Sequence, residues 1–279
     1  MNAPNDEFRV HFWGVRGSIA CPGPETIRYG GNTSCVEMSC GGRLLIFDAG
    51  TGMRPLGRHL DAQGRPVEAD IYFSHSHFDH ICGLPFFSSA YVPSNKFRLW
   101  AGHLLPDHTL RYVLSEMMMA PVFPIPITVL GADLSFHDFR AGETLSPGPG
   151  ITVRTAPLNH PNGATAYRVE YAGRSACYVT DHEHTGSVHQ DALLALLDRA
   201  DIVIYDATYT DAEYPGHKGW GHSTWQEGVR LAEQAKVKQF VIFHHDPGHD
   251  DATMDEIAAA AARARPNTIV AAEGMTLWP

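Results

Sequence analysis

The chain has 279 residues, of which 44% are hydrophobic, and its 21 basic against 31 acidic side chains give a formal net charge of −10 at pH 7. This hydrophobic content is ordinary for a globular protein with a buried core, and no stretch approaches the apolar length of a membrane span. Because a negative surface repels a long polyphosphate, we expect a small-molecule substrate, with neither a nucleic-acid polymer nor a membrane as partner.

The ends and the cysteines favour a cytoplasmic protein. The first residues lack the positive charge and apolar block of a secretory signal. The five cysteines are scattered, odd in number and without a C-x-x-C pair, which indicates reduced thiols. No tandem repeat or low-complexity linker divides the sequence, so we expect one domain over residues 1–279.

In the first half, strands alternate with loops rich in glycine and proline. Strands are predicted over residues 8–13, 33–38, 44–47, 69–73 and 97–101, and a helix over residues 104–119. The segment 120–127 contains three prolines, which prevent a central strand or a helix. It is interpreted as a loop lying on the core, with a lid over a site or a homodimer contact as alternatives.

The second half repeats the order of strands followed by a helix. A strand over residues 151–155 and a hairpin of strands 166–171 and 175–180 precede a helix over 191–199. A strand over 201–205, a helix over 225–235 capped by Ser223 or Thr224, a strand over 238–243, a helix over 254–264 and a strand over 268–272 follow. Two similar halves of this kind predict an α/β fold.

Three histidines and a carboxylate follow directly after the strand at 69–73. Neutral imidazoles and carboxylates are the ligands that borderline divalent metals such as zinc accept, and here they are His75, His77, Asp79 and His80. A tight turn can point alternate side chains to two neighbouring positions, so the spacing favours two metals. The alternative is a polar surface turn, but unpaired imidazoles beside a buried strand would be costly.

The pattern His75-x-His77-x-Asp79-His80 resembles the H-x-H-x-D-H signature of the metallo-β-lactamase-fold hydrolases. This resemblance implies a four-layer αββα sandwich with two similar halves. It also implies that His75 and His77 hold a first metal ion, and Asp79 and His80 a second. Two divalent ions are therefore expected, zinc first, with manganese or iron as alternatives.

The same resemblance extends along most of the chain. His160, just beyond the strand at 151–155, matches the third ligand of the first metal, and Asp181 matches the carboxylate that touches both ions. His245 matches the last ligand of the second metal, because it precedes a proline turn. Side chains alternate along a strand, so only one of His244 and His245 can face the site. Asp48 matches an aspartate that supports the ligands from outside, although it could instead be a helix N-cap.

Two further segments resemble ribonuclease Z, the transfer-RNA 3′-processing ribonuclease, and its phosphodiesterase relatives. Asp206 lies in a segment similar to their H-E-A-T motif, and His222 lies in one similar to their H-S-T motif. The resemblance implies hydrolysis by a metal-bridging hydroxide, with His222, paired with Asp206, donating a proton to the leaving oxygen. Asp79, Asp206 and His222 are thus the candidate catalytic residues.

The substrate is less constrained than the chemistry. In the ribonucleases that the chain resembles, a long arm that grips the RNA lies between the motifs matching His160 and Asp181. Here a tight hairpin takes its place, so the comparison implies a small phosphodiester instead of RNA. An acyl hydrolase, such as a lactonase or thioesterase, is the first alternative, and a metal-bound sensor without catalysis is the second. Arg16 could meet a substrate anion or be solvated, and five other polar residues receive no role at this point: His182, Glu183, His184, His217 and His249.

Overall fold

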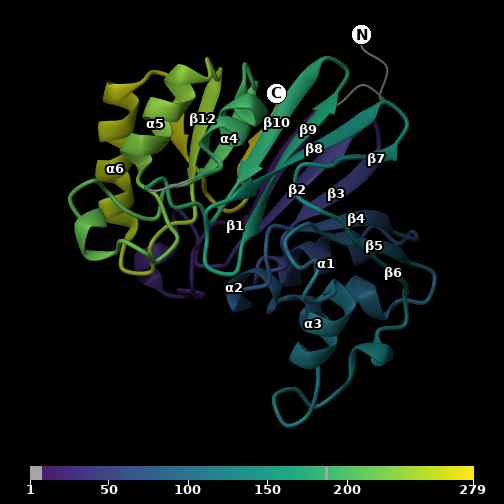
Figure 1. Cartoon of the computed structure of the whole chain (residues 1–279). Coiled ribbons are helices and arrows are strands. Elements are labelled where there is room, and N and C mark those ends of the chain that lie inside the picture. The colour runs from purple at the N-terminus through teal and green to yellow at the C-terminus, as the bar shows by residue number, and fades with distance from the viewer. Residues whose placement is uncertain (1–7, 186–187) are drawn as a thin grey trace.

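Two β-sheets face each other, and helices cover their outer faces, in a computed structural model that describes residues 8–185 and 188–279 (Figure 1). Each sheet has seven strands. The predicted four-layer αββα sandwich is therefore confirmed. No helix in the described ranges has the length and apolar character needed to span a membrane.

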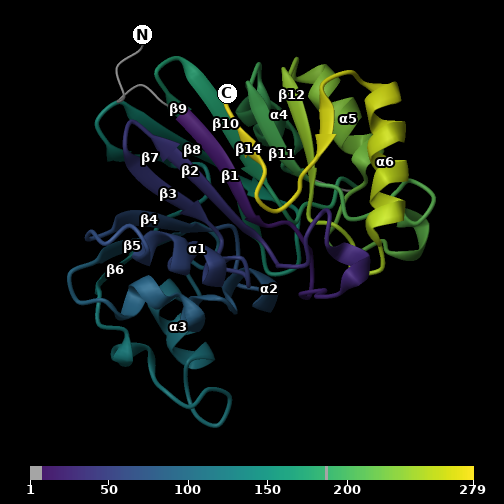
Figure 2. The same cartoon turned by 180° about the vertical axis from the view of Figure 1, so that it is seen from behind.

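The first sheet is built from the N-terminal half and closed by a strand from the C-terminus. Its strands are β1 (Phe8–Gly14), β2 (Cys35–Cys40), β3 (Arg43–Phe47), β4 (Glu68–Phe73), β5 (Lys96–Ala101), β6 (Asp133–Asp138) and β14 (Thr276–Leu277). They lie in the order β14-β1-β2-β3-β4-β5-β6. Helices α1 (Met53–Asp61), α2 (Phe78–Ile81) and α3 (Leu110–Met117) accompany this half. Figure 2 shows β14 beside β1, with which it pairs in antiparallel register.

The second sheet comes from the C-terminal half. Its strands are β7 (Thr144–Gly148), β8 (Ile151–Leu158), β9 (Ala164–Tyr171), β10 (Arg174–Val179), β11 (Ile202–Asp206), β12 (Gln239–Phe243) and β13 (Thr268–Val270). They lie in the order β13-β12-β11-β10-β9-β8-β7. Helices α4 (Gln190–Leu197), α5 (Trp225–Gln234) and α6 (Asp251–Ala264) cover it. Strands β10 to β13 are parallel, so their carboxyl ends reach the same edge.

The layer between the sheets is rich in aromatic rings. Within the first sheet, Phe47 stacks on Tyr72 with ring centroids 5.3 Å apart. The ring centroid of Tyr178, in the second sheet, lies 5.6 Å from that of Phe47. Separate apolar clusters fill the spaces between each sheet and its helices. Both sheets are therefore buried on both faces, which fixes the positions of their strand ends.

The observed elements differ from the expected ones in one helix start and in several short elements. The helix expected over 104–119 begins only at Leu110, since Pro106 interrupts the segment and the side chain of Thr109 caps the helix. The short strands β6, β7 and β14 and the helices α1 and α2 had not been predicted. In the proline-rich segment, Phe123 packs edge to face on Phe86 with centroids 5.9 Å apart and contacts the apolar cluster of the first sheet. Val122 in the same segment is 75% exposed, so only part of this loop lies on the core.

Candidate metal centre

Histidine and aspartate side chains from both sheets meet at one edge of the sandwich. Each follows the end of a strand: β4 leads to the histidine-rich turn and α2, β8 to His160, β10 to Asp181, and β12 to His244. The residues that meet there are His75, His77, Asp79, His80, His160, Asp181 and His244. Six of the seven predicted metal ligands are therefore brought together, and the exception is His245.

Three histidines form the first group, with ligand atoms all within 4.8 Å of one another: His75, His77 and His160. Nε2 of His160 lies 3.0 Å from Nδ1 of His77. Oδ2 of Asp181 lies 3.6 Å from Nε2 of His75 and 3.6 Å from Nε2 of His160. His77 is partly exposed, whereas the side chain of His160 is only 2% exposed.

The second group, Asp79, His80 and His244, is fully buried. Nε2 of His80 lies 3.0 Å from Oδ2 of Asp79 and 3.3 Å from Nε2 of His244. The other carboxylate oxygen of Asp181, Oδ1, lies 3.2 Å from Nε2 of His80 and 3.2 Å from Nε2 of His244. The two oxygens of Asp181 thus face two separate groups.

The five imidazoles of this cluster are oriented by hydrogen bonds from their outward ring nitrogens. The acceptors are Ser74 Oγ for His75 (3.0 Å), Asn162 Oδ1 for His77 (3.3 Å), Asp48 Oδ2 for His80 (2.8 Å), the Gly221 carbonyl for His160 (2.8 Å) and Thr208 Oγ1 for His244 (3.0 Å). In the neutral form of each ring, the inward nitrogen is therefore the one that carries the lone pair. Nε2 of His75 is buried and has no hydrogen-bond partner in the described residues. The donor set fits divalent metal ions.

Asp48 is not part of the cluster but is hydrogen-bonded to His80, which is. Its carboxylate accepts hydrogen bonds from the backbone and hydroxyl of Ser74, from Nδ1 of His80 and from the hydroxyl of Tyr178, at 2.7 to 2.8 Å. The alternative role as a helix N-cap is not observed, since α1 begins after Gly52. Asp48 thus orients His80 directly and His75 through Ser74.

Buried charge makes the centre attractive to cations. Burial alone would raise the pKa of Asp181, but His244 and His80 hold it well below its usual range. The pKa of Asp79 is lowered in the same way by His80 and His244. Conversely, burial would lower the pKa of His80, yet Asp79 and Asp181 raise it well above its ordinary value. Positive charge is therefore favoured between these carboxylates.

Three residues of the site have left-handed backbone conformations directly after strands. The φ angles are 60° for Asp48, 57° for Asp181 and 62° for His244. Such a conformation costs an L residue about 1 to 3 kcal/mol and recurs at functional sites. It also ends the alternation of side chains that holds in an extended strand.

The prediction of His245 as the cluster residue is wrong for this reason. His244, in the left-handed conformation, turns its ring toward Asp79 and Asp181. The ring of His245 instead lies in the core, where its Nε2 donates to the carbonyl oxygen of Ala271 at 2.8 Å. Alternation along β12 could not choose correctly between them, because the rule applies only while the backbone stays extended.

Exchanging these two neighbours for alanine separates their roles. We expect His244→Ala to lower the metal content of reconstituted protein, because it removes an inward nitrogen. His245→Ala should keep the metal content and lower the free energy of unfolding by about 1 to 3 kcal/mol, since it leaves a buried carbonyl unpaired. Elemental analysis and chemical denaturation measure both effects. Loss of metal from His245→Ala alone would contradict the assignment.

His222 and Asp206 form a buried pair beside the cluster. Nδ1 of His222 lies 3.0 Å from Oδ2 of Asp206 and 3.7 Å from Oδ2 of Asp181. Burial lowers the pKa of His222, but Asp206 more than offsets this and raises it to about 9. The His222 ring centroid is 5.4 Å from that of His160 and 5.0 Å from that of His244. A charged imidazole therefore lies against both groups of the cluster.

Glu183 holds the loop that carries His222, a role not predicted from the sequence. Its carboxylate accepts hydrogen bonds from the Tyr214 hydroxyl (2.8 Å) and from the backbone of Gly219 (2.8 Å) and Gly221 (3.0 Å). No motif marks a carboxylate that binds backbone groups thirty or more residues further along the chain. The loop is thereby fixed where the Gly221 carbonyl meets His160.

Gly221 has a φ of +89°, and a Cβ there would lie 2.3 Å from Nδ1 of His160. We expect Gly221→Ala to displace that ring and to weaken metal binding by roughly 10- to 100-fold, the usual effect of losing a ligand's outer hydrogen bond. Competition with a coloured chelator measures the affinity. The control is Gly216→Ala, where a Cβ meets nothing within 4 Å. Equal affinities in the two variants would contradict the prediction.

The remaining polar residues of the sequence analysis lie outside the cluster. Arg16 is fully buried and donates to the carbonyls of Gly30, Asp246 and His249, so it ties loops together and does not face a substrate. The others have local partners: the backbone of Asn159 for His182, Ser223 for His184, the Tyr209 ring for His217, and Glu213 for His249.

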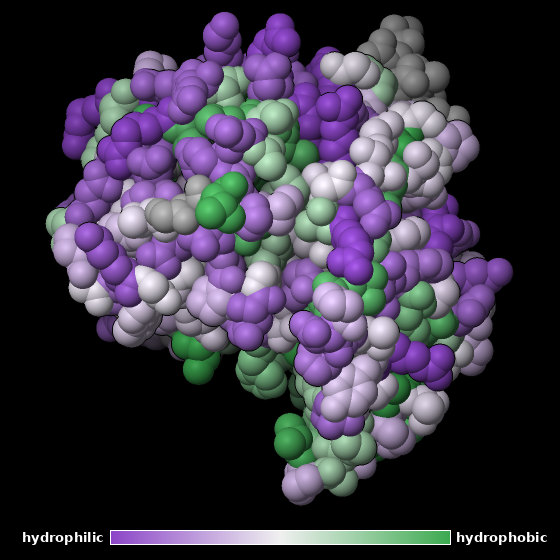
Figure 3. All heavy atoms as spheres, in the orientation of Figure 1, coloured by the Kyte–Doolittle hydropathy of each residue, from purple (hydrophilic) through white to green (hydrophobic). Residues whose placement is uncertain are grey.

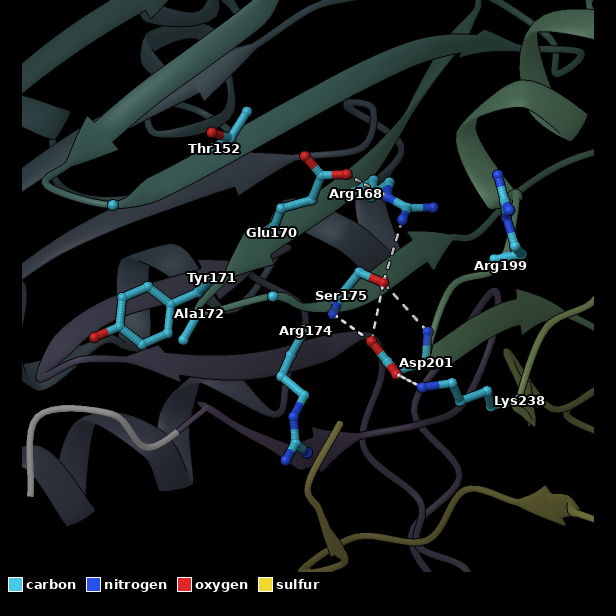
Figure 4. Close-up of a pocket in the computed structure, with 12 residues that line it drawn as sticks. Thr152, Arg168, Glu170, Tyr171, Ala172, Arg174, Ser175, Arg199, Asp201 and Lys238 are labelled. Atoms are coloured by element: carbon cyan, nitrogen blue, oxygen red, sulfur yellow. Dashed lines mark hydrogen bonds and ion pairs between the residues drawn. The ribbon is translucent and has the colours of Figure 1, made fainter. Parts of the chain in front are cut away.

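Figure 4 shows a polar pocket at the opposite end of β10 from Asp181. Arg174, which lines it, is the first residue of that strand, whereas Asp181 follows the last. Charged groups in the pocket are paired, Lys238 with Asp201 at 2.5 Å and Arg168 with Glu170 at 2.8 Å. The first pair joins the starts of β12 and β11, the second lies within β9, and neither belongs to the cluster.

An αββα sandwich with a cluster of histidine and aspartate at one edge defines the metallo-β-lactamase fold class of hydrolases. The sequence matches the Beta-lactamase superfamily domain over residues 43–245, which is more than half of the chain. The chain therefore belongs to this superfamily and is a metal-dependent hydrolase of it.

Relatives and solved structures extend the similarity to nearly the whole length. A ribonuclease Z of Haloarcula marismortui is 25% identical and aligns over 95% of this chain and 94% of its own. The fold matches that of the metallo-β-lactamase fold protein YhfI from Bacillus subtilis (TM-score 0.72, 17% identity, 98% of this chain and 100% of that one). It also matches the short form of human tRNase Z (TM-score 0.67, 20% identity, 96% and 98%).

These relatives overturn the expectation that no nucleic-acid polymer is a partner. Several of them bear the name ribonuclease Z. The expectation rested on the tight hairpin between His160 and Asp181 and on the net charge of −10, which is a sum over the whole chain. That sum does not describe the field at a site that would hold divalent cations, so it cannot exclude a polyanionic substrate.

Proposed function

We propose that this protein hydrolyses phosphodiesters with two divalent metal ions that share one carboxylate. His75, His77 and His160 would hold one ion, Asp79, His80 and His244 the other, and Asp181 both. The observation that carries the proposal is that Oδ2 and Oδ1 of Asp181 face these two separate groups, at 3.6 and 3.2 Å. Zinc is the proposed metal, and manganese and iron accept the same ligands.

When bound, such a pair of ions lowers the pKa of water to about 7 and neutralises charge on the phosphate. Orientation of the ligands and proton donation are tasks of the protein's own side chains. Asp48, Ser74 and Thr208 keep the histidine rings in one tautomer. Asp206 engages Nδ1 of His222, so Nε2 is the atom that can give a proton to the leaving oxygen. An alkoxide needs such an acid to leave.

The His222–Asp206 pair favours an ester with an alkoxide leaving group over a thioester, and among such esters the names of the relatives favour a phosphodiester. A thiolate or a phenolate leaves without help, whereas the alkoxide of a natural diester does not. A small diester is the proposed minimal substrate, and RNA with a 3′ extension is the natural comparison because relatives are named ribonuclease Z.

The proposal is tested by comparing substrate classes on protein loaded with zinc, manganese or iron. Turnover of bis(p-nitrophenyl) phosphate, of a dinucleotide and of 3′-extended RNA is measured beside that of lactones and thioesters. We expect diesters to be hydrolysed and to be preferred. Efficient hydrolysis of lactones or thioesters with inert diesters would favour an acyl hydrolase, and failure on every ester would favour a metal-bound sensor.

A further inference from the structure

The polar pocket of Figure 4 lies roughly 20 Å from the cluster, because β10 runs from one to the other at about 3.3 Å per residue. Its volume is about 420 Å³, a size that suits a small-molecule ligand. Figure 3 shows mainly hydrophilic groups along the upper edge of this face, where β10 and β12 begin in Figure 1. Neither the metal cluster nor the proposed function uses this cavity.

Basic side chains are in excess in this pocket, although the whole chain carries a formal charge of −10. Four cationic and two acidic side chains line it, and they are Arg168, Arg174, Arg199, Lys238, Glu170 and Asp201. Two of their partners lie just outside, Arg154 at 3.3 Å from Glu170 and Asp198 at 3.0 Å from Arg199. These two add one charge of each sign. A surplus of two positive charges therefore remains, and it attracts anions to this end of the molecule.

Arg168 is a fixed cation in the pocket. Its largely buried guanidinium donates through Nη1 to two carbonyl oxygens at the end of α4, each at 2.8 Å. Its Nη2 donates to the hydroxyl of Ser175 at 3.3 Å, which is longer than an ordinary N–H···O bond. These acceptors are neutral and leave the charge in place. The acid that Arg168 meets, Glu170, is shared with Arg154.

Two further cations of the pocket are solvent-accessible. Arg199 pairs with Asp198, and the two side chains are 76% and 53% exposed. Pairs as exposed as this one contribute little to stability, so Arg199 can turn toward a ligand at small cost. Lys238 is 73% exposed and pairs with Asp201 at 2.5 Å. Its ammonium group has three N–H donors, of which this carboxylate needs only one.

We propose that this pocket binds a dianionic phosphate group, either as inorganic phosphate or as a phosphate monoester. The surplus of two positive charges matches the charge of such a group near pH 7. Guanidinium and ammonium groups are the side chains with which proteins hold phosphate. Thr152 and Tyr171 also line the cavity, which is larger than a bare phosphate ion and has room for an ester group. A phosphodiesterase releases such a monoester, but binding here does not depend on the proposed function.

Calorimetric titration of the metal-loaded protein with inorganic phosphate tests the inference. Arg199→Gln and Lys238→Gln each remove one exposed cation, whereas Arg168 is left intact because it also holds the end of α4. Each variant should weaken phosphate binding at the pocket by about tenfold or more, the usual effect of losing a hydrogen bond to a charged group. The metal centre is unaltered in both variants, so phosphate held there contributes equally to all titrations.

Matched variants exclude a general effect of charge or folding. Lys236→Gln removes an exposed cation outside the pocket, from a residue whose φ of 55° resembles the 51° of Arg199. It should bind phosphate like the unaltered protein. Lys238→Arg keeps the charge and should retain binding. Glycerol 2-phosphate distinguishes the two sources, because tighter binding of the ester identifies a monoester as the ligand and weaker binding identifies inorganic phosphate.

The outcomes separate this inference from the proposed function. Phosphate binding that is equally strong in Arg199→Gln, in Lys238→Gln and in the unaltered protein would overturn the inference. A single phosphate site that disappears when a chelator removes the metal would overturn it as well. If no diester is hydrolysed, the proposed function fails, and phosphate binding that depends on Arg199 and Lys238 still supports the pocket.

Discussion

Replacing Asp181 by asparagine should cost the protein at least one of the two metal ions proposed for the centre and roughly 10³-fold or more in kcat. The amide supplies one oxygen in place of two, so it cannot face both groups that the carboxylate oxygens now face at 3.6 and 3.2 Å. Removal of a single preorganised charge contact commonly costs 10² to 10³ in kcat, and here a metal ion would be lost as well.

The measurement is metal content after reconstitution and dialysis, together with turnover of a small diester. Asp107→Asn makes the same chemical change at an exposed position far along the chain from the cluster and serves as the control. A variant of Asp181 that kept two metal ions and near-normal turnover would show that the carboxylate is not shared.

Replacing His222 by alanine should slow the hydrolysis of different diesters by very different factors. A proton donor matters only when the leaving oxygen is basic, so a dinucleotide with an alkoxide leaving group should lose about 10²- to 10⁴-fold in kcat. Bis(p-nitrophenyl) phosphate releases a stable phenolate and should lose tenfold or less. The buried pairing with Asp206 at 3.0 Å is the structural basis of this expectation.

The leaving-group series also separates proton donation from metal loss, because His222 lies only 3.7 Å from Asp181. Loss of a metal ion would slow all diesters together. His108→Ala, at an exposed position on another loop, is the control for surface changes. Equal losses for alkoxide and phenolate leaving groups would exclude His222 as the donor.

The fold could be predicted because its determinants are local. Buried strands such as β4 and β12 are nearly continuous apolar runs, and the order of strands and helices is the same in both halves. The histidine-rich turn then fixed which strand ends had to converge. Where prediction failed, the segments were short or irregular: Pro106 and the Thr109 cap delay α3, the six-residue edge strand β6 has only Leu134 and Phe136 as apolar residues, and β7 contains a proline.

The site was predictable in composition and less so in detail. His160 and Asp181 could be found because each ends a strand in the expected order. The choice between His244 and His245 depended on one φ angle of 62°, which sequence patterns do not reveal. The roles of Glu183 and Arg16 depend on backbone groups that they bind far along the chain. Such contacts leave no mark in residue type or spacing.

Anomalous diffraction from crystals of the zinc-loaded protein tests the account most directly. Two peaks are expected, one on each side of the Asp181 carboxylate. One should lie within about 2.2 Å of ligand atoms of His75, His77 and His160, and the other within the same distance of Asp79, His80 and His244. A single peak, or a peak beside His245, would contradict a pair of ions sharing Asp181.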